Sequence, residues 1–212
     1  RFHVDTYYAW PGGTYSYWCG EFNPAFTGGD GYGNGWDERL ELPPIDVTTP
    51  PATYPVLTYR YRHDTEPYYD YTYVQAESLG TYVSLNRGYD GTSGGWQDIG
   101  VYGFLLVGYD QPLRIRFRFV SDAAYSDEDA VYDSDGGAFH VDDIKVFDYF
   151  TGHVYFFDDA EDGIGQCTPA VPGAAGDYWH ITPRPCSAFS PPNVWWCGDD
   201  ADTSLVPPNL QD

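Results

Sequence analysis

The sequence is built from short segments in which apolar and polar residues alternate. In the clearest of these, residues 113–120, four large apolar side chains alternate with Arg114, Arg116 and Arg118. Side chains of a β-strand point alternately to opposite faces, so this segment is expected to be a strand with one buried face. Further strands are expected at residues 56–62, 71–77, 81–85, 138–147 and 153–157.

Glycine and proline separate these segments. The chain has 24 Gly and 17 Pro, which favour turns. It has no amphipathic helical segment longer than about three turns. Many short strands joined by turns are typical of two packed antiparallel sheets. The sequence therefore predicts an all-β fold, an antiparallel jelly-roll β-sandwich.

A motif near the start of the chain recurs near its end. The residues Tyr-Trp-Cys-Gly at 17–20 have a counterpart in Trp-Trp-Cys-Gly at 195–198. Upstream, Phe-His-Val at 2–4 has a counterpart in Trp-His-Ile at 179–181. Matches at two spaced positions indicate an internal repeat.

The repeat predicts how the chain is divided. Residues 1–150 are expected to form the jelly-roll domain, and residues 151–212 an extended tail that begins a second copy of the module. The segment 154–163 precedes the second copy, whereas no matching segment precedes Phe2 in the first. The first copy is therefore expected to have an open strand position with unpaired backbone groups.

That open position can be filled in two ways. Residues 154–158 can fold back onto their own domain. Alternatively, the tail of another subunit can donate a strand, as a truncated second module, and a contact of this kind propagates head to tail into a filament. The side chains expected to carry such an assembly are Phe156, Phe157, Trp179, Trp195 and Trp196.

The chain is strongly acidic, with a net charge of −22 from 32 acidic and 10 basic residues. Nucleic acids and anionic membranes bind basic surfaces, so neither is an expected partner. No apolar run is long enough to insert across a bilayer. Four Cys in an aromatic β-chain suit an oxidising compartment, and a secreted protein, extracellular or at the cell surface, is expected.

The four cysteines allow three pairings. Cys167 and Cys186 are the favoured disulfide, because neither has a counterpart in the first copy of the repeat. Cys19 and Cys197 occupy equivalent positions in the two copies. They are either small buried apolar residues beside Trp or a second pair that bridges the tail and the body.

Acidic residues are densest in a loop at 127–135, which includes Asp127 and Asp129. Ca²⁺ takes oxygen ligands, so this loop is a candidate for a structural Ca²⁺ site, although it lacks the EF-hand pattern. The alternative is that these carboxylates are solvated or pair with the arginine row of residues 114–118, where each exposed pair contributes roughly 0–1 kcal/mol.

Catalytic motifs are weak. Residues 91–95 satisfy Gly-x-Ser-x-Gly, but a nucleophile elbow needs a strand before it and a helix after it, and a Gly-rich turn is expected instead. No His-Glu-x-x-His occurs, and the chain is not expected to be an enzyme. Aromatic rings on loops can stack on sugar rings or pack in the core, and the candidates for glycan stacking are Trp10, Trp36 and Trp96.

Four strings resemble a known family. They are Tyr-Trp-Cys-Gly (17–20), Gly-Tyr-Gly-Asn-Gly-Trp-Asp-Glu-Arg-Leu (31–40), Arg-Ile-Arg-Phe-Arg-Phe (114–119) and Ser-Asp-Gly-Gly-Ala-Phe-His-Val-Asp-Asp-Ile (134–144). They are similar to the jelly-roll, MAM-like modules of secreted bacterial proteins, including those appended to immune-inhibitor-A-type metalloproteases. The resemblance covers residues 1–150 and the start of a second module, whose truncation departs from the family pattern.

This resemblance implies a carbohydrate-binding or adhesion domain that carries structural Ca²⁺. The ligands that it implies are Asp142, Asp143, Asp159 and Glu161. Taken with the repeat, the first functional expectation is a non-catalytic extracellular structural protein that associates head to tail with copies of itself through its C-terminal tail. The alternative is a carbohydrate-binding or adhesion module of a larger secreted enzyme, with an extracellular polysaccharide as partner.

Overall fold

The structure, a computed structural model, describes residues 1–170, 179–182 and 194–197. The chain divides into two compact units, Arg1–Val171 and Pro172–Asp212. The first unit extends beyond the boundary expected at residue 150, because strands β13 (Val154–Asp158) and β14 (Thr168–Ala170) pair with strands of the body. No helix among the described residues has the length and apolar character needed to cross a membrane.

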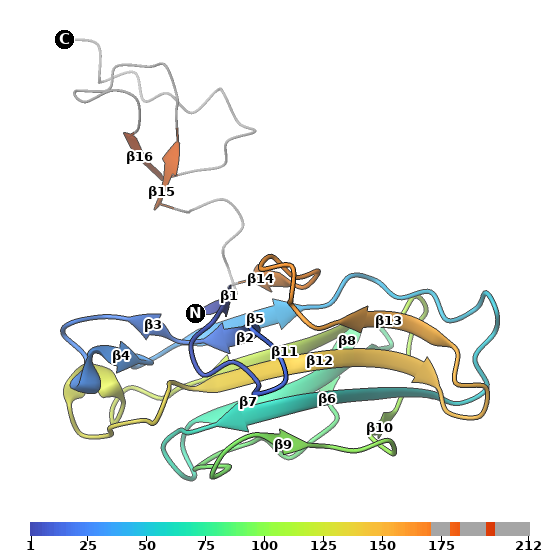
Figure 1. The fold of residues 1–212 in the computed structure, drawn as a ribbon, viewed down its shortest axis with the longest axis horizontal. Helices are drawn as coiled ribbons and strands as arrows, with labels where there is room; N and C mark the ends of the chain where they lie inside the picture. The colour runs from blue at the N-terminus through green and yellow to red at the C-terminus, as the bar shows by residue number, and fades with distance from the viewer. Residues whose placement is uncertain (171–178, 183–193, 198–212) are drawn as a thin grey trace. The chain divides into compact units, whose positions relative to one another are not determined.

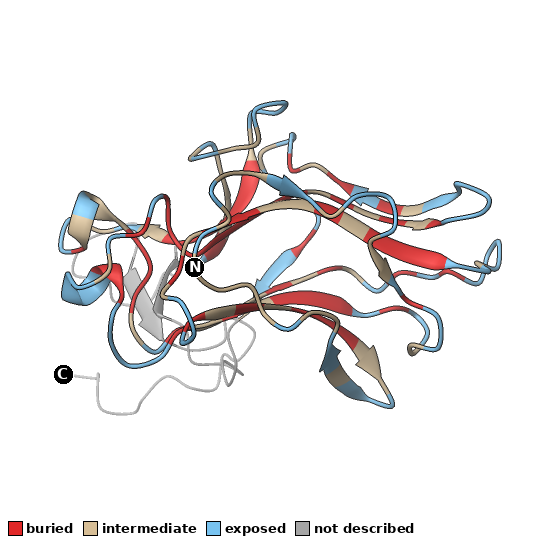
Figure 2. Ribbon diagram, turned by 90° about the horizontal axis from the view of Figure 1, so that it is seen from below, coloured by how far each residue is buried: buried red, intermediate tan, exposed pale blue. Residues whose placement is uncertain are grey.

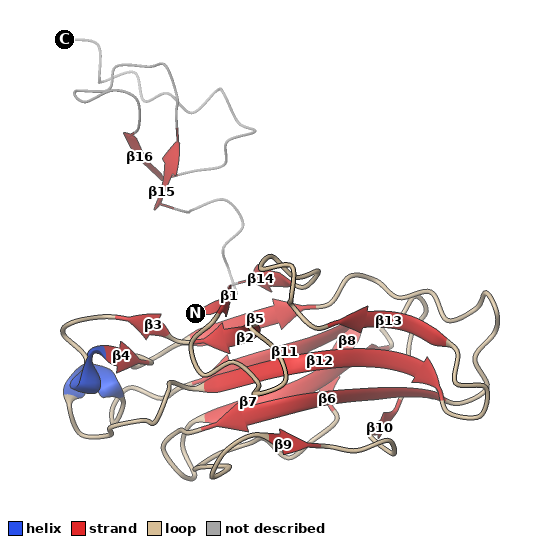
Figure 3. Cartoon of the chain, viewed as in Figure 1, coloured by secondary structure: helices blue, strands red, loops and turns tan. Residues whose placement is uncertain are grey.

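The first unit is a sandwich of two antiparallel sheets, as the alternating segments predicted (Figures 1 and 3). The larger sheet has the order β1-β2-β12-β6-β10, with β13 paired to β12 and β9 paired to β6. Its further strands are β1 (Phe2–Asp5), β2 (Ser16–Cys19), β6 (Pro55–His63), β9 (Gln97–Asp98), β10 (Phe104–Leu105) and β12 (Phe139–Asp148).

The second sheet has the order β14-β5-β11-β7-β8. Its strands besides β14 are β5 (Asp37–Glu41), β7 (Tyr71–Ser78), β8 (Thr81–Ser84) and β11 (Ile115–Val120). A small pair, β3 (Glu21–Phe22) with β4 (Asp30–Gly31), and two short 3-10 turns, Thr27–Gly29 and Asp127–Asp129, complete the unit.

The core lies between the two sheets, where both present their apolar side chains (Figure 2). On β11, Ile115, Phe117 and Phe119 are fully buried, as the alternation at 113–120 predicted. Arg118 lies on the other side of the same strand and forms two 2.7 Å hydrogen bonds to Asp37 on β5. The period of two thus separates a buried face from a charged one.

Strand β12 contains a β-bulge at Asp142 and Asp143. Its register with β6 shifts between Asp142 and Lys145, and Asp143 has a φ of 49°. A bulge inserts one extra residue, so it moves the inward positions from odd to even residue numbers. The core side chains of β12 are Phe139, Val141, Ile144 and Val146.

Strands β2 and β13 lie end to end along one edge of β12. β2 pairs with Phe139–Val141, and β13 pairs with Ile144–Phe147 beyond the bulge. The strand position expected to be open is therefore occupied by the chain's own residues 154–158. Phe156 points inward and is buried, whereas Phe157 is 44% exposed.

In the second unit, strands β15 (Trp179–Thr182) and β16 (Val194–Cys197) form an antiparallel hairpin. Trp179 pairs with Cys197, and in the first unit Phe2 pairs with Cys19. The two hairpins therefore share one register, although the second connection is one residue longer. The repeated sequence forms a repeated local structure.

Cys19 and Cys167 are both buried and form no disulfide within the described part of the chain. Burial raises the pKa of the Cys19 thiol to about 12. Cys19 therefore fits the alternative of a small buried residue beside Trp. Cys186 and the side chain of Cys197 lie outside the described residues, so the two pairings that involve them stay predictions.

Candidate functional site

Polar and aromatic side chains lie on the outer face of the larger sheet. Leu57 and Tyr59 of β6 point into the core, so the alternate residues of this strand face outward. The register places outward residues of β6 directly opposite outward residues of β12. These pairs are Val56–Phe147, Thr58–Lys145, Arg60–Asp142 and Arg62–His140.

The connection between β1 and β2 covers one end of this face. In Figure 1 it is the dark-blue loop that crosses in front of β12 and β6. The Arg60 guanidinium lies 4.2 Å from the centre of the Trp10 ring, and the Arg62 guanidinium lies 3.9 Å from the centre of the Tyr8 ring. Such cation–π contacts attach the loop to the sheet.

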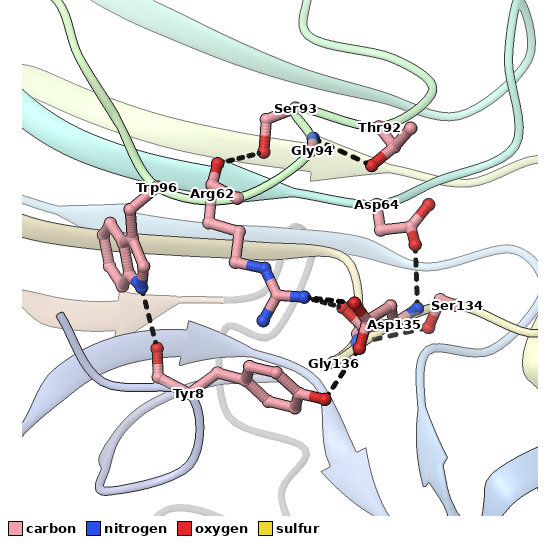
Figure 4. A network of polar contacts seen from close by, with 12 residues as sticks. Tyr8, Arg62, Asp64, Thr92, Ser93, Gly94, Trp96, Ser134, Asp135 and Gly136 are labelled. Carbon is pink, nitrogen blue, oxygen red and sulfur yellow. Dashed lines mark hydrogen bonds and ion pairs between the residues drawn. The ribbon is translucent and has the colours of Figure 1, made fainter. Parts of the chain in front are cut away.

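Hydrogen bonds fix this loop from both sides (Figure 4). The Trp96 indole Nε1 donates to the Tyr8 carbonyl at 3.0 Å, and the Tyr8 hydroxyl donates to Asp135 at 2.7 Å. Arg62 pairs with the same Asp135 carboxylate at 2.7 Å, and Asp64 accepts from the Asp135 amide at 2.8 Å. Four separate segments thus hold the aromatic residues in place.

Trp10 and Trp96 lie side by side, and both are half-buried. Their ring centroids are 5.8 Å apart and the rings are nearly perpendicular. Arg60, which contacts the Trp10 ring, also lines a hollow of about 330 Å³, called here the arginine hollow. The residues that define it are Thr58, Arg60, Asp98, Val101, Asp143 and Lys145.

The two carboxylates of the arginine hollow both pair with Arg60. Arg60 lies 2.8 Å from Asp143 and 3.6 Å from Asp98. Lys145 lies on the next outward position of β12 and covers the Phe147 ring at 4.8 Å. Charged donors and acceptors beside aromatic rings can hydrogen-bond the hydroxyl groups of a ligand while its apolar faces stack.

Trp36, in contrast, is a core residue. It is 8% exposed and packs edge-on to Phe119 with 6.5 Å between ring centroids. The loop that carries it closes one end of the sandwich, so neither face of the ring is available to a sugar. The sequence located Trp36 on a loop but gave no sign that the loop is packed inward.

The four carboxylates implied by the family resemblance lie near enough for Asp143, Glu161 and Asp159 to repel Asp142, but their oxygens do not converge on one point. Asp143 is paired with Arg60, and Glu161 accepts hydrogen bonds from the amides of Thr14 and Tyr15. Asp159 accepts from the Glu161 amide at 3.2 Å. Among the described residues, these four do not all bring an oxygen within 4.8 Å of one another.

Asp142 is the buried member of this group. It is 2% exposed and accepts one hydrogen bond, 2.6 Å from the Asp143 amide. Burial, followed by repulsion from neighbouring carboxylates, raises the pKa of Asp142 to about 7. This carboxyl group therefore changes its protonation state near neutral pH.

Asp127 and Asp129 organise their own loop. Asp127 is fully buried and accepts from the Tyr32 amide at 2.9 Å and from the amide and hydroxyl of Ser134 at 2.7 and 2.8 Å. Asp129 accepts from the amides of Tyr125 and Val131. Their oxygens accept hydrogen bonds that shape the loop, as in Asx turns.

The structure contains a different carboxylate cluster, which was not predicted from the sequence. Glu66, Asp70 and Asp122 each place one oxygen within 4.8 Å of the others. Asp70 is fully buried, and the Glu66 Oε2 atom is buried with no hydrogen-bond partner. Burial raises the pKa of both side chains. The three residues come from the segment before β7 and the loop after β11, a juxtaposition that no sequence spacing indicates.

Ser93 lies in a turn, as expected for the Gly-x-Ser-x-Gly segment. Its hydroxyl is 2.7 Å from the Gly95 carbonyl and accepts from the His63 amide at 3.0 Å. The His63 ring contacts the Asp90 carbonyl instead of the serine. This geometry serves the turn and provides no activated nucleophile.

Comparisons with known proteins do not assign a family. A scan against protein-family models finds no match, and a search of curated proteins finds no similar sequence.

Proposed function

We propose that this chain is a non-catalytic extracellular module that binds carbohydrate on the outer face of its larger sheet. The observation that carries the proposal is the pair Trp10 and Trp96, held 5.8 Å apart and linked to the arginine hollow by Arg60, which lines the hollow and contacts the Trp10 ring. The hollow has about 330 Å³, within the range of roughly 300–1,000 Å³ typical of ligand sites.

The chemistry of these residues suits a sugar. Pyranose rings have apolar C–H faces that stack on indole, and hydroxyl rims that exchange hydrogen bonds with carboxylates and guanidinium groups. Arg60, Asp98 and Asp143 provide such groups in fixed ion pairs. Hydrogen bonds and cation–π contacts hold the Trp10 and Trp96 rings in place without a ligand, which lowers the entropic cost of binding.

Binding of soluble oligosaccharides tests the proposal. Isothermal titration with cellohexaose, xylohexaose and mannohexaose is expected to give saturable binding to at least one of them, weakened by Trp96→Ala. The matched control is Tyr69→Ala, which removes an exposed aromatic ring far from the hollow in the sequence and absent from its lining. Equal binding by the Trp96 variant, or none by the wild type, would count against the proposal.

Head-to-tail association through residues 151–212 remains a second proposal. The observation that favours it is the common register of the β15–β16 and β1–β2 hairpins. In the first unit β2 pairs with β12, whereas the described residues of the second hairpin pair only with each other. An isolated hairpin is marginally stable, so the second hairpin would gain from pairing with an exposed sheet edge of another copy.

Light scattering tests this second proposal. The full chain is expected to assemble, and a chain that ends at Val171 is expected to stay monomeric, because it keeps the whole first unit and loses the second hairpin. Assembly of both chains would place the contact elsewhere. The resemblance to MAM-like modules is compatible with either proposal.

We also keep structural Ca²⁺ as a proposal, at residues other than those that the sequence suggested. Glu66, Asp70 and Asp122 fit a hard cation, because they supply three carboxylate oxygens and one of these, Glu66 Oε2, is buried without a partner. Asp127 and Asp129 are not among the described carboxylates that bring their oxygens within 4.8 Å of one another.

A further inference from the structure

A second hollow lies on the same face of the larger sheet. It has about 340 Å³ and is called here the tyrosine hollow. Its lining comes from the segment before β6, the segment around β10 and the turn between β12 and β13. The lining residues are Tyr54, Val56, Tyr102, Leu105, Tyr149 and Phe150.

The rings of this hollow are exposed and form its walls. Tyr102 is 77% exposed and Phe150 is 70% exposed. Tyr54 lies 5.3 Å from Phe150 and 6.1 Å from Tyr149, and Tyr102 lies 5.8 Å from Tyr149, measured between ring centroids. An exposed, contiguous group of aromatic residues on a globular protein marks a binding surface.

A buried carboxylate holds the hollow in shape. Asp148 is 1% exposed and accepts hydrogen bonds from the amides of Thr53 and Tyr54, both at 2.7 Å. Its other oxygen accepts from Phe150 at 3.1 Å and from Thr151 at 2.9 Å. One side chain thus ties the segment that carries Tyr54 to the turn that carries Phe150.

The two hollows are continuous along β6. Val56 lines the tyrosine hollow, whereas Thr58 and Arg60 line the arginine hollow, and all three are successive outward positions of one strand. At about 3.3 Å per residue, Val56 and Arg60 are roughly 13 Å apart along the strand. On the neighbouring segment, Val101 of the first hollow is followed directly by Tyr102 of the second.

We propose that the tyrosine hollow, the arginine hollow and the Trp10–Trp96 pair form one track for a linear, uncharged, β-linked polysaccharide. This inference rests on the proposed carbohydrate function and extends it to a second subsite and a ligand class. The tyrosine hollow has no charged lining residue, and its rings and hydroxyls suit a neutral sugar. The ring faces would stack on pyranoses whose hydroxyls are equatorial, because both faces of such sugars are apolar.

The charge of the chain selects against anionic polysaccharides. A net charge of −22 repels polymers that carry carboxylate or sulfate groups, and the repulsion acts before contact. A linear chain also fits two hollows in a row, whereas a branched or globular ligand would fill one. The expected ligand is therefore an unsubstituted glucan or xylan.

Affinity as a function of chain length separates the inference from the proposed function. Titration with cellobiose and cellohexaose, and with the matching xylo-oligosaccharides, is expected to give tighter binding of the longer sugar. Tyr102→Ala is expected to weaken hexasaccharide binding roughly two- to tenfold and to leave disaccharide binding at the Trp pair unchanged. Trp96→Ala is expected to weaken both.

The outcomes are distinguishable. If Tyr102→Ala leaves hexasaccharide affinity unchanged while Trp96→Ala lowers it, the track is wrong and the Trp site stands. If the wild type binds none of the sugars, both proposals fail. If Tyr102→Ala instead changes the particle mass in light scattering and no sugar binds, the tyrosine hollow is an interface between copies.

Asp148→Asn provides a second variant that does not remove a ring from the hollow. An amide has one acceptor oxygen in place of two, so one of the two segments loses its anchor. Hexasaccharide affinity is expected to fall while disaccharide affinity stays at the wild-type value. Circular dichroism of each variant controls for loss of the fold.

Discussion

Gly20 lies with its Cα directly against the indole ring of Trp18, two residues earlier in the chain. A Cβ at Gly20 would overlap the Nε1 and Cε2 atoms of that ring, and a Cβ at Gly137 would meet the same Nε1. Trp18 cannot move aside easily, because it is fully buried and stacks on His140 with 7° between the planes. The Trp-Cys-Gly motif therefore requires glycine at position 20, because the Trp18 ring occupies the space that a side chain would need.

Replacing Gly20 with Ala is expected to lower the free energy of unfolding by about 1–3 kcal/mol, the usual cost of overpacking a buried site. Urea denaturation measures this change. Gly35→Ala is the control, since Gly35 has a φ of 68° and nothing within 4 Å of an added Cβ. Gly20 has no positive φ, so backbone strain contributes to the Gly35 variant alone, and unchanged stability of the Gly20 variant would contradict the contact with Trp18.

Replacing Asp142 with Asn is expected to change how stability depends on pH. The folded pKa of Asp142, about 7, lies above the unfolded value of 3.8, so the folded state binds more protons between these values. The free energy of unfolding of the wild type therefore falls as pH rises from about 4 to about 7. Relative to the wild type, the variant gains stability at pH 8, by at most about 4 kcal/mol, and much less at pH 4.

His140 produces the opposite trend and must be separated from this effect. Burial lowers the pKa of His140 to about 3, so its contribution to stability is lost as pH falls below about 6.5. His140 is present in both proteins, and the difference between their unfolding curves isolates Asp142. A difference that does not depend on pH would contradict the burial of an ionisable carboxyl group at this position.

Calcium is expected to raise the melting temperature of the wild type, and EGTA to reverse the effect. At a concentration about ten- to a hundredfold above the dissociation constant, the stabilisation is roughly 1–3 kcal/mol. Glu66→Gln is expected to abolish it. Glu161→Gln is the matched comparison, and loss of the effect in that variant alone would place the ion among the residues that the family resemblance implies.

A chain that ends at Val171 is expected to unfold in one cooperative transition. A chain that ends at residue 150 loses β13 and β14, exposes one edge of β12 and leaves the site of the buried Phe156 side chain empty. The lost burial of that ring alone is about 1.5–3 kcal/mol, to which the unpaired edge adds. Equal stability of the two chains would show that β13 contributes nothing to the first unit.

The sequence predicted the strands that have one buried face. Alternation at 113–120 corresponds to β11, and alternation at 71–77 corresponds to β7 (Tyr71–Ser78). It did not predict the bulge in β12, because a change of phase at Asp142 and Asp143 looks like a polar interruption of a strand. It offered the fold-back of residues 154–158 as one of two alternatives and placed the domain boundary at residue 150, since a strand's partner is set by contacts distant in the chain.

The candidate site was less predictable than the fold. Trp10 and Trp96 were singled out as aromatic residues on loops, but only the structure places them together. Trp36 met the same criterion and is buried. The tyrosine hollow combines three segments, around Tyr54, Tyr102 and Tyr149, and none of them carries a local pattern. Composition gave an excess of tyrosine without indicating where it gathers.

The connection between β1 and β2 holds Tyr8 and Trp10 over the sheet, and its counterpart between β15 and β16 is one residue longer. The hairpin register is nevertheless the same. A gain or loss of residues in this connection therefore leaves every strand position on its original face. A change in the length of this loop can therefore alter which aromatic rings lie over the sheet without moving any residue of the strands.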